Sequence, residues 1–242
     1  AYHVAAGRDW HGNKIKQGVV LYLAAEGGNG YLNRARAIQD HYQDTDVPLA
    51  VRPCPVNLLD PDADLERLCN LTDLVKEKYG KIELIVVDTL SRSMAGGNEN
   101  SPEAMTAVIQ HCDLLREHSD ASIALVHHSG KAGNEAGARG HSSLRAATDT
   151  EIELHVDEDA GIRFAKATKQ RDIESGKEFA FELKAVELGC DEDGDPVTSC
   201  YITPADDERV SEATTKLSPN ERLIEQCFTQ LWGEQIGGPN PG

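Results

Sequence analysis

The sequence has 242 residues, of which 39% are hydrophobic, and a formal net charge of −17 at pH 7. This length is enough for one large domain with a substantial buried core, or for one domain and part of another. The acidic balance excludes a surface that is basic throughout, so any contact with nucleic acid has to come from a local cluster of cations.

The cysteine and hydropathy patterns indicate the cellular compartment. The six cysteines are scattered without a Cys-x-x-Cys pair, and the nine histidines form no His-Glu-x-x-His motif, so we do not expect a zinc site. Unpaired cysteines favour a reducing compartment. No apolar run approaches the roughly 18 residues of a membrane span, and no signal peptide opens the sequence. We therefore expect a soluble, cytoplasmic protein.

Helices and strands alternate through the first half of the chain. In order, we expect the end of a helix at 1–7, a strand at 19–25, a helix at about 31–42, a short strand at 49–52, a helix from 61 to 80, a strand at 82–88, a helix from 101 and a strand at 122–126. Three of the strands are continuous apolar runs, which is typical of parallel strands covered on both faces.

The second half of the chain changes to hairpins. A loop rich in Gly and Ala, expected to be mobile, spans 129–140, and a helical or coil link spans 141–148. An antiparallel meander is expected from the four strands at 150–156, 162–168, 178–186 and 197–203. The predicted fold class is therefore α/β, with a mostly parallel sheet flanked by helices and antiparallel strands at its carboxyl-terminal edge.

Polar residues follow the three continuous apolar strands. These strands end at Glu26, at Asp88 and at the pair His127 and His128. Open α/β sheets bind their ligands at the carboxyl ends of the strands. There Asp88 could hold Mg²⁺, Glu26 could act as a general base toward water, and His128 could sense a terminal phosphate. The alternatives are a turn-favouring Asp, a capping Glu and a His bonded to the backbone.

A phosphate-binding loop is the part that such a site needs and that this sequence does not contain. The motif is Gly-x4-Gly-Lys-[Ser/Thr], because the Lys neutralises phosphate and the hydroxyl binds Mg²⁺. The glycines at 27–30 lack that Lys. The pairs Gly80-Lys81, Gly130-Lys131 and Gly176-Lys177 lack a following hydroxyl.

The order of these motifs resembles the RecA-like P-loop ATPases of the RepA-type replicative helicases, which are related to DnaB-type helicase cores. The resemblance runs to about residue 203 and is carried by residues 1–12, 20–28, 85–90, 124–131, 139–149 and 168–172. It implies an ATPase core over 1–204 that begins after its first strand and P-loop. A polar linker at 205–218 would follow, and then the start of a further helical domain at 219–242, for which a winged helix is one candidate.

The resemblance also implies a function and its cofactors. It points to a hexameric, ATP-dependent DNA helicase in the replication of a phage, plasmid or other mobile element, which encircles single-stranded DNA and can work with a primase. ATP with Mg²⁺ would be the cofactor. Asp88 would hold Mg²⁺ through water, with Glu26 and Thr89 beside it. Lys169 and Arg171 would reach the γ-phosphate in the neighbouring subunit's site, as an arginine finger does.

A cluster of cations and hydroxyls is the candidate for DNA contact. It comprises Lys131, Arg139, His141, Ser142 and Arg145. A glycine-rich loop with such groups suits non-specific phosphate binding in the channel of a ring. The alternative is an ordinary surface loop.

Two other functions fit the same motifs. One is a RecA-like ATPase in recombination or regulation that does not unwind DNA. The other is a non-catalytic binding module that has lost its P-loop. On either helicase or ATPase interpretation, a chain without a P-loop is expected to be inactive alone.

Overall fold

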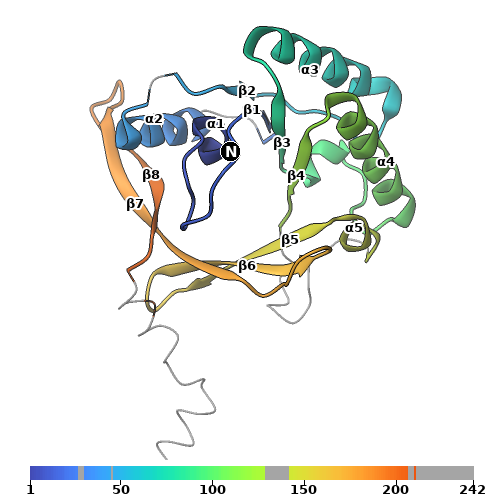
Figure 1. Ribbon diagram of the computed structural model, residues 1–242. Coiled ribbons are helices and arrows are strands. Elements are labelled where there is room, and N and C mark those ends of the chain that lie inside the picture. Colours follow the sequence, from blue (N-terminus) through green and yellow to red (C-terminus); the bar gives the residue numbers. More distant parts are fainter. Residues whose placement is uncertain (27–29, 45, 129–141, 207–209, 211–242) are drawn as a thin grey trace, which may run out of the picture.

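Two four-stranded sheets form the body of the computed structural model, which describes residues 1–26, 30–44, 46–128, 142–206 and 210 (Figure 1). The first sheet is parallel, with strand order β2-β1-β3-β4. Its strands are β1 (Val19–Ala24), β2 (Leu49–Arg52), β3 (Ile82–Asp88) and β4 (Ser122–Val126). The second sheet is antiparallel, in chain order. Its strands are β5 (Thr150–Asp157), β6 (Ile162–Gln170), β7 (Glu178–Cys190) and β8 (Pro196–Pro204).

Five α-helices are present in the described part of the chain. They are α1 (Tyr2–Ala6), α2 (Gly30–Tyr42), α3 (Glu66–Tyr79), α4 (Pro102–Ser119) and α5 (Ser142–Ala147). A short π-helical turn, Pro61–Leu65, leads into α3, and a 3₁₀ turn, Ser91–Met94, follows β3. The helix ends agree with local sequence signals. Gly7 closes α1 in the left-handed conformation, and the Ser101 hydroxyl caps α4 by accepting a hydrogen bond from the Ala104 amide at 3.2 Å.

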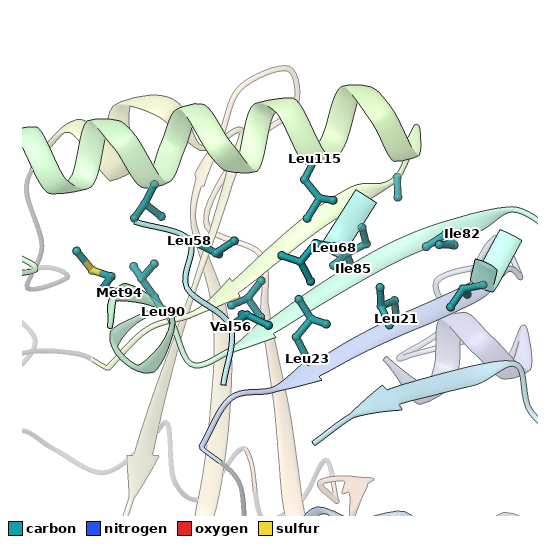
Figure 2. Packing of buried hydrophobic residues seen from close by; sticks show 14 of the residues in the cluster. Leu21, Leu23, Val56, Leu58, Leu68, Ile82, Ile85, Leu90, Met94 and Leu115 are labelled. Atoms are coloured by element: carbon teal, nitrogen blue, oxygen red, sulfur yellow. The ribbon is translucent and has the colours of Figure 1, made fainter. Parts of the chain in front are cut away.

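The main core lies between the first sheet and the helices α3 and α4 (Figure 2). Leu21, Leu23 and Ile85 from the strands meet Leu68 of α3 and Leu115 of α4, and each is at most 1% exposed. Burial of a side chain of this size stabilises the fold by about 1.5–3 kcal/mol. A smaller cluster on the other face packs α1 against β1 and β3. Strands β1 and β3 are therefore covered on both faces, as their continuous apolar runs predict. The same expectation is wrong for β4, in which Ser122, Ala124 and Val126 are exposed because β4 is the outer strand of the sheet.

The predicted α/β class is confirmed, but the antiparallel strands differ from the prediction in one respect. We expected them at the edge of the parallel sheet, whereas they form a sheet of their own. Among the described residues, β4 pairs with β3 alone and β5 pairs with β6 alone. The described residues show no backbone hydrogen bond between β4 and β5, so the two sheets are separate.

Strand β5 has an unusual distribution of side chains. Its apolar residues Ile152, Leu154 and Val156 are 60%, 64% and 51% exposed, while the polar residues between them are half-buried. An outer strand with an exposed apolar face is a site where association is expected. Among the described residues, no helix is both long and apolar enough to cross a membrane.

Candidate nucleotide site at the strand ends

The carboxyl ends of β1, β3 and β4 lie level with one another. Ala24 is paired with Asp88, and Asp88 with Val126. Two backbone hydrogen bonds continue this alignment past the strands: the Ala25 amide donates to the Asp88 carbonyl at 2.7 Å, and the Leu90 amide donates to the Val126 carbonyl at 2.8 Å. The residues that follow the three strands therefore begin at one edge of the sheet, where parallel α/β sheets bind ligands.

Three of the side chains predicted from the sequence meet at this edge. The Thr89 hydroxyl donates to Glu26 Oε1 at 3.4 Å, and His128 Nε2 lies 3.7 Å from the same oxygen. Thr89 is buried, whereas the Glu26 and His128 side chains are 53% and 74% exposed. A carboxylate oriented by a buried hydroxyl and open to water can accept a proton from a water molecule.

Asp88 has a partner that the sequence analysis missed. The Tyr22 hydroxyl, from the neighbouring strand β1, donates to Asp88 Oδ2. Burial, together with this hydrogen bond, raises the pKa of Tyr22 above its ordinary value, so the hydroxyl remains a donor at neutral pH. The one available signal was a single tyrosine in an otherwise aliphatic strand. The peptide bond between Asp88 and Thr89 is cis.

A second missed residue is Glu99, in the segment between β3 and α4. His127 Nε2 lies 3.1 Å from Glu99 Oε2, and the two side chains are 10% and 28% exposed. A hydrogen bond from Ser91, followed by the hydrogen bond and charge of His127, holds the pKa of Glu99 below its ordinary value. The two adjacent histidines therefore have different surroundings: His127 contacts Glu99, and His128 contacts Glu26.

The side chains at this edge fit part of a nucleotide complex. Mg²⁺ keeps several waters and uses one or two carboxylates together with substrate phosphates. A carboxylate accepts at both oxygens, so Asp88 can receive Tyr22 on one oxygen and a metal-bound water on the other. The phosphates of a nucleotide lack partners at this edge, because the sequence contains no P-loop whose Lys and hydroxyl would bind them. Within the described residues, no group of three or more His, Cys, Asp or Glu could hold a metal.

The predicted finger residues lie beside α5 and the start of β5. The Lys169 amine donates to the Arg145 and Thr148 carbonyls, the latter at 2.6 Å. Arg171 Nη1 lies 2.6 Å from Asp149 Oδ1. A cation at the carboxyl end of a helix satisfies its last carbonyls and complements its dipole. In the single chain both cations therefore stabilise the end of α5 and the start of β5.

The predicted DNA-contact residues can be placed only in part. Lys131, Arg139 and His141 lie outside the described residues, and the Ser142 side chain is likewise not described. Arg145 is described, and its Nε lies 3.4 Å from Glu151 Oε2. Its charge is thus partly compensated within the chain, which weakens it as a free phosphate contact.

Comparison with known proteins gives the family. A family model described as an AAA domain matches residues 1–134, more than half of the 242 residues. The chain belongs to the AAA domain family. The matched part of this AAA domain runs from α1 through β4 and contains Glu26, Asp88 and His128.

No curated protein matches the chain. Among solved structures, the crystal structure of the RadB recombinase is similar with a TM-score of 0.46 and 16% sequence identity, over 69% of this chain and 76% of that chain. The part of the chain that the AAA domain model matches includes the whole parallel sheet and the polar residues at its strand ends.

Proposed function

We propose that this AAA domain is the hydrolytic core of a RecA-like ATPase that works on DNA, and more specifically of a hexameric replicative helicase of the RepA type. The observation that supports the proposal most directly is the meeting of Glu26, Thr89 and His128 beside Asp88, at three level strand ends. Each of these groups has a task in phosphoryl transfer to water.

The residues divide the work as follows. Asp88, oriented by Tyr22, would hold the Mg²⁺ of a bound nucleotide through water. Glu26, oriented by Thr89, accepts the proton of the attacking water. His128, which is largely exposed beside Glu26, donates a hydrogen bond toward the terminal phosphate. The Mg²⁺ ion supplies neutralisation of phosphate charge when it is bound.

Two parts of the complete site have to come from other polypeptide. The phosphates need the Lys and hydroxyl of a P-loop, which these 242 residues do not contain. The neighbouring site in a ring would receive Lys169 and Arg171 as its finger. For that role Arg171 has to exchange Asp149 for phosphate, and Lys169 has to release the α5 carbonyls.

ATP turnover tests this proposal on two proteins. The 242-residue chain is expected to show no Mg²⁺-dependent turnover, whereas a chain joined to a Gly-x4-Gly-Lys-[Ser/Thr] segment encoded upstream is expected to hydrolyse ATP. Glu26→Gln should then lower kcat by about 10²–10⁴-fold. Glu83→Gln is the matched control, because Glu83 lies on strand β3 of the same sheet and forms an ion pair with Lys16 at 2.8 Å. Turnover that survives Glu26→Gln would refute the assigned role.

The finer parts of the proposal need their own assays. Strand displacement on a forked DNA substrate separates a helicase from a RecA-like ATPase that hydrolyses ATP without unwinding. The mass of the P-loop-containing protein with a non-hydrolysable nucleotide tests the hexamer. A monomer that hydrolyses ATP at full rate would exclude a finger supplied by a neighbouring subunit.

A further inference from the structure

The two histidines after β4 differ sharply in their exposure. The side chain of His127 is 10% exposed and that of His128 is 74% exposed. Consecutive side chains of an extended segment point to opposite sides. The backbone conformation that places the ring of His127 inside therefore places the ring of His128 outside, beside Glu26. A contact that fixes the orientation of the His127 ring also fixes the direction of the His128 ring.

Glu99 is the group that holds the ring of His127. The 3.1 Å contact between His127 Nε2 and Glu99 Oε2 is largely shielded from water, where a charge-assisted hydrogen bond is stronger than at the surface. Glu99 lies in the segment that follows β3, and His127 follows β4 directly, so their contact links these two segments.

The backbone contacts alone do not give this orientation. The hydrogen bond from the Leu90 amide to the Val126 carbonyl, at 2.8 Å, holds the last residue of β4 level with β3. The torsions of the next two residues remain adjustable after that bond is made, because strand pairing ends at Val126. The side-chain contact with Glu99 is thus the restraint that acts on His127 itself.

We propose that Glu99 and His127 are positioning residues, which hold the backbone after β4 so that His128 stays against Glu26. The inference rests on the proposed function, in which Glu26 and His128 act on the water and the terminal phosphate. It adds a mechanical consequence: a movement of the segment that carries Glu99 reaches His128 through His127.

A coupling measurement on the 242-residue chain tests the proposal without nucleotide. The side-chain NMR resonances of His128 are recorded with and without Glu26→Gln. The substitution should shift them, because the ring lies 3.7 Å from the carboxylate. In a Glu99→Ala background the shift of the His128 resonances should be smaller by about half or more, because substitutions at coupled residues are not additive. Glu99→Gln should preserve the response, since its amide oxygen still accepts from His127.

The outcomes separate positioning from general damage. An unchanged response in Glu99→Ala would overturn the proposal, and so would an equal loss in the control Glu83→Ala on strand β3. If Glu99→Ala does not fold, as judged by far-UV circular dichroism, His127→Phe takes its place. That variant keeps an aromatic ring but removes the nitrogen that contacts Glu99, so a partial loss supports the proposal and no loss overturns it. A P-loop-containing protein that fails to hydrolyse ATP would refute the function and leave this coupling intact.

Discussion

Removal of the Tyr22 hydroxyl is the sharpest test of the Asp88 environment. In Tyr22→Phe the ring and its packing stay, while the hydrogen bond to Asp88 Oδ2 is lost. A hydrogen bond to a charged group contributes about 1.5–3 kcal/mol. Asp88 is half-buried, so water replaces part of the bond. We therefore expect the free energy of unfolding to fall by about 1–2 kcal/mol at pH 7.

The pH dependence of this loss gives a second, independent readout. Burial and the contact with Asp88 raise the pKa of Tyr22 in the folded state. A group with a raised folded pKa contributes stability below its ordinary pKa, which is about 10 for tyrosine, and loses that contribution as the pH rises toward the folded value. The stability difference between the wild-type protein and Tyr22→Phe should therefore shrink as the pH rises above 10.

Urea unfolding, followed by far-UV circular dichroism across this pH range, measures both effects. Tyr79→Phe is the control, because Tyr79 is 49% exposed at the end of α3 and loses the same hydroxyl. If both variants unfold alike at pH 7, and the difference does not shrink in alkali, the hydroxyl does not hold Asp88. The orientation assigned to the metal-holding carboxylate would then be wrong.

Two further predictions concern the other parts of the molecule. Hydrogen bonds from Arg8 and then Tyr2 hold the pKa of Asp44 below its ordinary value, so the contribution of Asp44 to stability is present above about pH 4 and is lost as the pH falls further. In Asp44→Asn the melting temperature should therefore fall less steeply below about pH 4 than in the wild-type protein. An equal fall in both proteins would contradict the pairing. Leu154→Thr on the outer strand β5 should reduce both the binding of a hydrophobic dye and self-association, while the free energy of unfolding changes by less than about 0.5 kcal/mol. Leu114 on α4 is also exposed, at 51%, and Leu114→Thr should reduce dye binding and self-association less.

The framework of the site was predictable because it depends on local patterns. A continuous apolar run that stops at a polar residue marks both a strand and the edge at which it ends. That pattern gave the limits of β3 and β4, and it placed Glu26, Asp88 and His128 at neighbouring strand ends before the strand order was known. Parallel strands of similar length then bring such residues to one edge without further information.

The partners of those residues were not predictable because they depend on register and on distant segments. Tyr22 reaches Asp88 only because β1 pairs with β3 so that Tyr22 lies beside Val86. Glu99 meets His127 across 28 residues of sequence, from a segment with no periodic pattern. Lys169 could be placed on a strand, but its carbonyl partners depend on where α5 ends.

On the proposed function, the carboxylates at the strand ends have to be offset by cations from outside these residues. Glu26, Asp88 and Glu99 bring carboxylates to the edge at which a nucleotide phosphate would sit, in a chain whose formal net charge is −17. Anionic phosphates are held there only if cations offset this repulsion. Lys169 and Arg171 are held at α5 and Asp149. A P-loop lysine and a finger from a neighbouring subunit would each supply the missing positive charge, so nucleotide affinity should depend on both and should not be restored by either one alone.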